Sequence, residues 1–194
     1  MSSYLINCIE AFVSEQYPRE LWEHIQRVRN TALLIAKSEN ASAESVEVLE
    51  LAVLLHDIAY SEQSAWVDHA AKSSQMAREK LLEYHMPVSR IDRVCECIQT
   101  HSFSSSQRPR LLEAKILFDA NSLELMGPVG IIRLCLSTKE SEDKSITSMA
   151  HKLRAFGQTH HDALFTAKAK SIAKRYWAYE REFLELLEKQ LTEN

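Results

Sequence analysis

The chain has 194 residues, of which 45% are hydrophobic, and its formal net charge at pH 7 is −4. This length is enough for one well-buried core and is short for two. Positive and negative residues are interspersed, so the sequence has no direct nucleic-acid footprint and no acidic tail. Three glycines and four prolines are few for this length, and such a composition favours long helices over strands joined by turns.

The apolar runs are too short to cross a bilayer, and the N-terminus lacks the pattern of a signal peptide. The four cysteines form no CxxC pair and do not have zinc-finger spacing. They are typical of reduced thiols, so we expect a cytoplasmic protein with no membrane partner.

Hydrophobic residues recur at helical spacing along most of the chain, which predicts an all-α fold. In the first half we expect helices over residues 2–16, 20–38, 43–59, 66–84 and 89–101. The third of these begins after Ser42, a natural N-cap, with Glu44 in its first turn, and it is apolar almost all round from Leu49 to Leu55. A helix that is apolar on every side is surrounded by others, so we predict that this helix is the central one.

In the second half the same spacing predicts helices over residues 111–126, 129–136, 146–156 and 163–191. We expect Gly127-Pro128 to end the first of these and Asp162 to cap the start of the last. The charged segment 139–144 is the best candidate for a mobile loop. Because no repeat or domain boundary is apparent, we predict a single domain of eight or nine helices over residues 1–194. Its long last helix packs either on its own domain or across a homodimer.

An apolar run leads directly into a histidine and an aspartate, His56 and Asp57. An ionised carboxylate among leucines is costly unless it is paired, and a metal ion is the commonest partner at such a step. A core histidine that hydrogen-bonds Asp57 or a backbone carbonyl would explain the same pair. The two residues alone therefore leave both interpretations open.

Three further histidines lie on or at the ends of other predicted helices. His24 is at the edge of the buried stripe of the second helix, His69 is near the start of the fourth, and His101 closes the fifth. Together with Asp57 and Asp119, a carboxylate in an apolar window, they form a spaced set of nitrogen and oxygen donors. Such a mixture suits Zn, Mn, Fe, Co or Ni, so the joint occurrence of these residues favours a metal site.

Four ordered segments resemble the HD-domain superfamily of metal-dependent phosphohydrolases, and most closely its compact bacterial branch. They are Trp22-Glu23-His24-Ile25-Gln26-Arg27-Val28, Leu54-Leu55-His56-Asp57-Ile58, Thr100-His101-Ser102-Phe103 and Asp119-Ala120-Asn121-Ser122-Leu123-Glu124. The likeness covers most of the chain, with a motif core over about residues 20–126 and C-terminal helices over about 128–191. A second His-Asp step, His161-Asp162, has no apolar run before it and is interpreted as unrelated to the motif.

The resemblance implies a divalent metal ion, one of Mn, Fe, Ni, Co, Zn or Mg, held by His24, His56, Asp57 and a later aspartate. The usual Asp-Ala-Asp-x-Leu-Asp is altered here, and the aspartate before x-Leu aligns with Asn121. Residues 119 and 121 lie about 200° apart on a helix, so both are not expected to reach one metal. Either Asn121 binds through its carbonyl oxygen or Asp119 takes the role, and its charge favours Asp119.

His69 and His101 resemble the residues that, in two-metal members of the superfamily, bind a second metal or contact a substrate phosphate. The resemblance implies metal-assisted hydrolysis of a small phosphorylated molecule, most readily a nucleotide. Asp57, with His56 beside it, would bind metal and help orient the nucleophile. Arg27 is either a phosphate clamp or a solvated surface arginine.

A different class of function is also open. The chain could be a metal- or ligand-binding regulatory module of the same fold with little or no turnover. Asn121 and Glu124 favour this alternative, because they remove an acidic ligand position and alter its neighbour.

Overall fold

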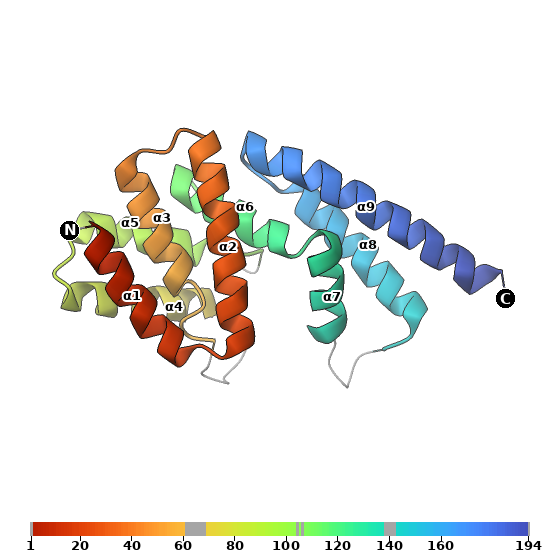
Figure 1. Cartoon of the computed structure of the whole chain (residues 1–194), viewed down its shortest axis with the longest axis horizontal. Coiled ribbons are helices and arrows are strands. Elements are labelled where there is room, and N and C mark those ends of the chain that lie inside the picture. Colours follow the sequence, from red (N-terminus) through yellow and green to blue (C-terminus); the bar gives the residue numbers. More distant parts are fainter. Residues whose placement is uncertain (1, 61–68, 104, 106, 138–142, 194) are drawn as a thin grey trace. The chain divides into compact units, whose positions relative to one another are not determined.

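The computed structural model describes residues 2–60, 69–103, 105, 107–137 and 143–193. Within these residues the chain forms nine helices and no strand, which confirms the predicted all-α class (Figure 1). The helices are α1 (Ser2–Gln16), α2 (Arg19–Ser38), α3 (Ala43–Leu55), α4 (His69–Glu83), α5 (Val88–Gln99), α6 (Leu112–Glu124), α7 (Gly127–Ser137), α8 (Ile146–Asp162) and α9 (Ala167–Thr192).

The start of α3 is as predicted and its end is earlier. The Ser42 side chain accepts a hydrogen bond from the Ser45 N–H at 3.1 Å, the geometry of an N-cap. The helix was predicted to continue to residue 59, but it ends at Leu55, and the Ile58 N–H then donates to the Leu55 carbonyl at 3.2 Å. This bond to the third residue back makes a tight turn, which a search for apolar periodicity does not distinguish from helix.

Two predicted boundaries in the second half are wrong. Gly127-Pro128 begins α7 instead of only ending the helix before it, because proline is well suited to the first turn of a helix, where its missing N–H has no partner to lose. Asp162 is the last residue of α8 and does not cap the next helix. The cap of α9 is Thr166, whose side chain accepts from the Ala169 N–H at 3.3 Å.

Some expectations fall outside the described residues, including most of the charged segment 139–144 and the predicted helical start at 66–68. None of the described helices combines the length and the hydropathy needed to span a membrane. The four cysteines are free thiols, as predicted. The alternative in which the last helix packs across a homodimer stays a prediction.

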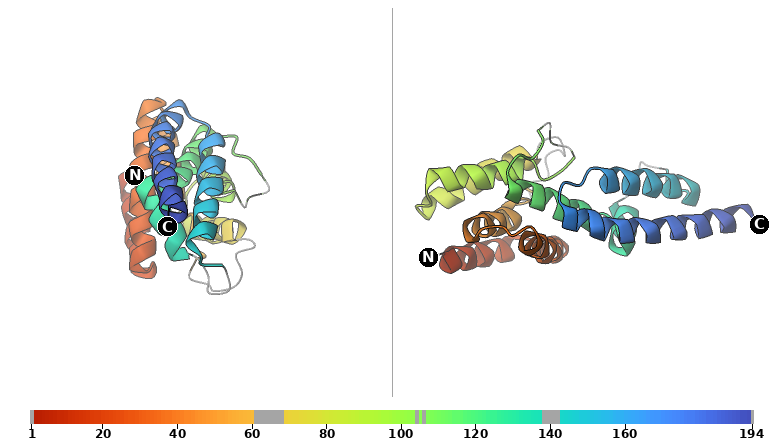
Figure 2. Two further views of the ribbon diagram at one scale, coloured as in Figure 1. Left: turned by 90° about the vertical axis from the view of Figure 1, so that its right-hand side faces the viewer. Right: turned by 90° about the horizontal axis from the view of Figure 1, so that it is seen from above.

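The chain divides by its internal packing into two compact units, Met1–Asn121 and Ser122–Asn194. In the first unit α3 packs against α1, α2, α4 and α5, which confirms that it is the central helix. The right-hand view in Figure 2 shows α3 between the α1–α2 pair and the α4–α5 pair. Every residue of α3 from Leu51 to Leu55 is fully buried. The single domain over residues 1–194 stays a prediction.

An arginine on α2 ties three helices of the first unit together. One Arg29 nitrogen, Nη1, lies 2.9 Å from the Glu10 carboxylate on α1, and Nη2 lies 2.7 Å from the Glu50 carboxylate on α3. The guanidinium is largely buried, so it is screened less by water than an exposed pair would be. These two contacts connect α2 to α1 and to the central helix.

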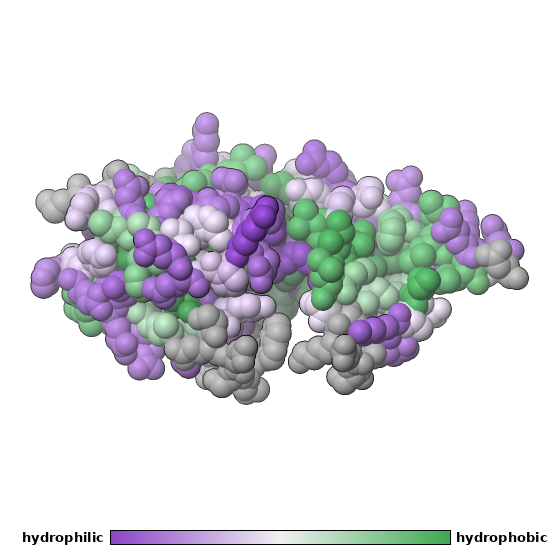
Figure 3. Space-filling model, turned by 60° about the horizontal axis from the view of Figure 1, so that its bottom comes forward, coloured by the Kyte–Doolittle hydropathy of each residue, from purple (hydrophilic) through white to green (hydrophobic). Residues whose placement is uncertain are grey.

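The second unit consists of the end of α6 and helices α7, α8 and α9. Helices α8 and α9 run side by side in opposite directions (Figure 1), and Ala150, Leu153 and Leu184 form a core cluster between them. Hydrophobic residues also gather on the surface of this unit (Figure 3), among them Ile132 and Leu136 on α7, which are 59% and 81% exposed.

Candidate metal centre

The central helix delivers His56 and Asp57 to the interior of the first unit. His56 is the C-cap of α3 and is completely buried, while the Asp57 side chain, one residue further on, is 13% exposed. The chain turns directly after them, and the Tyr60 N–H donates to the Asp57 carbonyl at 2.9 Å. Asp57 therefore lies in the turn that follows the buried helix. Its side chain is partly exposed, so a small ligand can reach it.

Four imidazoles surround the Asp57 carboxylate. His24 Nε2 and His56 Nε2 lie 3.9 and 3.6 Å from its Oδ2 atom. His69 Nε2 and His101 Nε2 lie 3.8 and 3.7 Å from its other oxygen, Oδ1. These histidines come from α2, the end of α3, the start of α4 and the residue after the C-cap of α5. Each carboxylate oxygen thus faces its own pair of ring nitrogens.

Backbone carbonyls determine which nitrogen of two histidines carries the proton. His56 Nδ1 lies 2.8 Å from the Val53 carbonyl, and His101 Nδ1 lies 2.7 Å from the Ile98 carbonyl. A carbonyl oxygen can only accept, so each Nδ1 carries the hydrogen and each Nε2 of the neutral ring has a lone pair. This is the usual arrangement of a metal-binding histidine, in which the second ring nitrogen is held by a hydrogen bond.

The Nε2 atom of His56 is buried and makes no hydrogen bond within the described part of the chain. Leaving such an atom unsatisfied costs roughly 1–3 kcal/mol. The His69 and His101 Nε2 atoms approach each other at 3.2 Å, and the His56 and His101 ring centroids are 4.9 Å apart. Ring nitrogens directed toward one another around a carboxylate fit a cation better than they fit an apolar core.

The charge state of the cluster also favours a cation site. Burial opposes ionisation of Asp57, but the surrounding histidines, His56 first, more than offset this and lower the pKa of the carboxyl to about 2. Burial, followed by the proximity of His56, lowers the pKa of His101 to about 4, and burial lowers the pKa of His56. Near neutral pH the site therefore presents the anionic Asp57 carboxylate beside the neutral His101 ring.

Two groups of three residues have ligand atoms that all lie within 4.8 Å of one another: His24 with His56 and Asp57, and Asp57 with His69 and His101. Asp57 belongs to both groups. Two imidazoles and one carboxylate form a donor set that suits borderline divalent metals such as Zn, Mn, Fe, Co and Ni. The cluster could hold one metal ion in either group, or two ions that share Asp57.

Both candidates for a later ligand lie on α6, and Asp119 belongs to neither of these groups. Asp119 is fully buried. Asn121 is half-buried, and its Nδ2 atom donates to the backbone carbonyl of His101 at 3.3 Å. The fourth ligand stays a prediction, and the contact between Asn121 and His101 links α6 to the cluster.

The remaining predicted residue of the site, Arg27, is half-buried on α2, one turn beyond His24. The second His-Asp step lies in the other unit, where His161 Nδ1 contacts the Asp162 carboxylate at 2.8 Å. Among the residues that the structure describes, neither His161 nor Asp162 belongs to a group that could hold a metal ion.

Two hydrogen bonds that support the site were not predicted from the sequence. The Tyr17 hydroxyl donates to the Leu54 carbonyl at 2.9 Å and so satisfies one of the open carbonyls at the end of α3. Burial, and then the charge of Asp57, raise the pKa of Tyr17. The Ser73 hydroxyl on α4 accepts from the Ala59 N–H at 3.2 Å. No sequence motif marks these residues, because each one bonds to a residue far from it along the chain. Only the fold brings the two partners of each bond together.

Comparison with known proteins places this geometry in context. The family model described as HD domain matches residues 21–126, more than half of the chain. The uncharacterized protein YpgQ of Bacillus subtilis is 23% identical over 194 residues, covering 94% of this chain and 90% of its own.

Solved structures with a similar fold span nearly the whole chain. An HD-superfamily hydrolase from Bacillus thuringiensis has a TM-score of 0.73 at 22% identity and is matched over 100% of both chains. YpgQ in complex with ADP also has a TM-score of 0.73, at 24% identity, over 97% of this chain and 96% of its own. At these identities the likeness shows a shared fold.

Proposed function

Because this chain belongs to the HD domain family, we propose that it is a metal-dependent phosphohydrolase whose substrate is a small phosphorylated molecule, most readily a nucleotide. The observation that carries the proposal is the Asp57 carboxylate, each of whose oxygens faces a pair of histidine Nε2 atoms. An arrangement that served only to pack the core would not need four imidazoles around one anion.

His24, His56 and Asp57 would hold the metal, with Asn121 or Asp119 on α6 as a further ligand. His69 and His101 would hold a second ion or contact a substrate phosphate. A divalent ion bound there supplies two effects, a lowered pKa for a coordinated water and polarisation of a phosphoryl oxygen.

The chain's own residues prepare this chemistry. The Val53 carbonyl holds the His56 ring in the tautomer that directs a lone pair inward, and the Ile98 carbonyl does the same for His101. Asp57 stays ionised and can accept a hydrogen bond from a water molecule, which orients that water toward phosphorus. Arg27, half-buried one turn from His24, would contact phosphate oxygens.

The choice of a nucleotide is supported by the related protein YpgQ, whose structure in complex with ADP shares this fold. The choice of a small substrate is supported by the sequence, which is acidic overall and has no broad basic footprint for a polynucleotide.

A regulatory module of the same fold is the second candidate. Asn121, which aligns with an acidic ligand position, uses its amide to contact the His101 carbonyl. Glu124, the last residue of the same motif, pairs with Arg133 at 3.3 Å. Both residues have structural partners, which favours binding without rapid turnover.

Metal content and phosphate release separate the two candidates. Purified protein should contain a stoichiometric transition metal and release phosphate or pyrophosphate from one or more members of a nucleotide panel. H56A/D57A should lose both properties, because it removes the shared carboxylate and a fully buried ligand.

The matched control is H161A/D162A, which removes the other His-Asp step, at the end of α8. This variant should keep its metal and its activity. Metal binding without any hydrolysis would assign the chain to the regulatory class. Hydrolysis that survives in H56A/D57A would refute the proposed centre.

A further inference from the structure

Charge is distributed unevenly in the second unit. Residues 144–181, which include α8 and the first half of α9, contain eight lysines and arginines and two acidic residues, although the whole chain has a net charge of −4. One of the two acids, Glu180, is 4% exposed, and burial raises its pKa to about 7. This stretch therefore carries a net positive charge, which favours the approach of anions.

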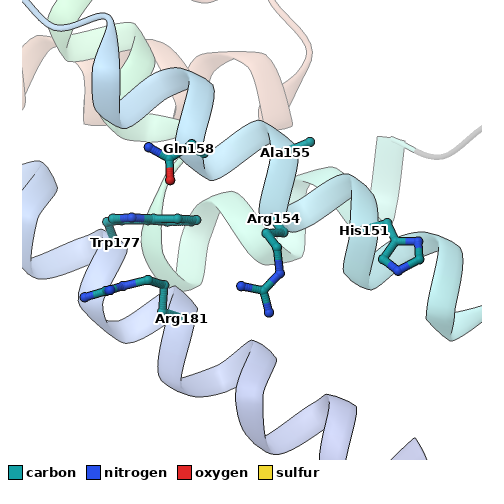
Figure 4. A pocket seen from close by; sticks show the side chains of 6 residues that line it. All are labelled: His151, Arg154, Ala155, Gln158, Trp177 and Arg181. Carbon is teal, nitrogen blue, oxygen red and sulfur yellow. The ribbon is translucent and has the colours of Figure 1, made fainter.

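A pocket of about 430 Å³ opens in this basic stretch, between α8 and α9. Its volume falls within the range of small-molecule sites. Figure 4 shows its walls, which are formed by His151, Arg154, Ala155, Gln158, Trp177 and Arg181. All of these residues belong to the second unit, whereas the ligand cluster around Asp57 belongs to the first.

The apolar wall of the pocket is held rigidly. Trp177 on α9 is 8% exposed and packs against Gly157 on α8, where an added Cβ would lie 2.6 Å from the ring atom Cζ3. Only a residue without a side chain allows the indole to come this close. In Figure 4 the ring is seen edge-on, with Gln158 over one face and Arg181 below the other. An aromatic ligand could meet the indole edge in the T-shaped geometry that aromatic pairs prefer.

Two guanidinium groups flank this wall. Arg154 Nη2 contacts the Glu188 carboxylate at 2.7 Å, but the two side chains are 42% and 45% exposed. An ion pair this exposed contributes at most about 1 kcal/mol. A phosphate can therefore replace Glu188 as the partner of the Arg154 guanidinium at little cost in free energy. Arg181, one turn beyond Trp177, forms no ion pair with any residue that the structure describes.

We propose that this pocket binds a small organic phosphate with a flat ring, for which a nucleoside monophosphate is the representative ligand. The phosphate would lie between Arg154 and Arg181, since planar guanidinium groups recognise phosphate oxygens in pairs. The ring would lie against the edge of Trp177 and the methyl group of Ala155. This binding needs neither a metal ion nor turnover, so it goes beyond the function proposed above.

The test uses the full chain treated with EDTA, in a W22F/W66F background that leaves Trp177 as the only indole. AMP should change the Trp177 fluorescence in a saturable way, with calorimetry as a second readout. Adenosine and inorganic phosphate should each bind about tenfold more weakly or worse, because each lacks one half of the recognised structure. Because the protein is free of metal, the result does not depend on the centre around Asp57.

R154Q/R181Q should weaken AMP binding about tenfold or more. The matched control, K170Q/K174Q, removes the same charge from exposed positions of α9 outside the pocket and should leave the affinity unchanged. Circular dichroism would establish that both variants fold. The proposal is overturned if AMP binding does not saturate by either readout, if adenosine binds as tightly as AMP, or if both double variants lose affinity equally.

Discussion

Single side chains in this protein have roles that depend on which atoms surround them. Asp57 is the clearest case, because its two oxygens face different pairs of histidines. His56 lies next to it in sequence and approaches its Oδ2 atom, whereas His69 and His101 approach Oδ1 from later helices. Asp57 belongs to both groups of three candidate ligands, so this one carboxylate can contribute to two metal positions.

Asn121 provides a test of the altered motif. N121D should tighten Mn²⁺ binding about tenfold, because a carboxylate beside the His101 carbonyl would add a negative charge to the donor set. Isothermal titration calorimetry would measure the change. The comparison variant is D119N on the same helix. If D119N weakens binding and N121D has no effect, Asp119 is the ligand.

Glu180 predicts a pH dependence of stability in the second unit. It is buried and accepts a hydrogen bond from the Gly127 N–H, and burial raises its pKa from 4.5 to about 7. The folded state then binds the proton more tightly than the unfolded state does. The resulting contribution to the stability of the folded state is complete below pH 4.5 and is lost as the pH rises through about 7.

E180Q keeps a neutral side chain at every pH and should remove that dependence. Urea denaturation across this window should show the wild type losing roughly 1–2 kcal/mol relative to E180Q, with solvent screening allowed for. E182Q, an exposed neighbour on α9, is the charge-matched control. Parallel curves for the wild type and E180Q would contradict the prediction.

At the scale of elements, helix packing depends on a few close approaches. The α8–α9 pair meets at Gly157, where an added side chain would collide with Trp177 and Glu180. G157A should therefore destabilise the protein by about 1–3 kcal/mol, although alanine is the better helix former. Chemical denaturation would measure this cost.

The control for helix propensity is A155G, at an exposed position of the same helix. It should cost up to about 1 kcal/mol through propensity alone. If G157A instead stabilised the protein, α8 and α9 would approach each other less closely at this position than the structure shows.

Sequence patterns predicted the elements well where the signals were local. The Ser42 cap and the apolar surface of α3 located the central helix, because both depend on neighbours within one or two turns. The boundaries at Gly127-Pro128 and Asp162 were wrong, because a Gly-Pro step can end one helix or begin the next, and aspartate occurs at both ends of helices. Only the surrounding hydrogen bonds decide between these alternatives.

At the scale of the whole molecule, every histidine of the candidate centre lies in the first unit. Bound Mn²⁺ should therefore slow amide exchange in α2, α3 and α5 more than in α8 and α9, because binding stabilises the state in which the ligands are assembled. Hydrogen–deuterium exchange followed by mass spectrometry would measure this by segment. H56A/D57A should show no metal effect, and equal protection of both units would contradict the prediction.

The sequence by itself determined the all-α class, the central position of α3 and the residues available as ligands, because periodicity, caps and motif order are carried by neighbouring residues. Only the tertiary structure decided that His24 and His56 face one oxygen of Asp57 while His69 and His101 face the other. It also brought Arg154 and Trp177 to one pocket. Side chains that lie tens of residues apart meet only through helix packing, whose register no local pattern encodes.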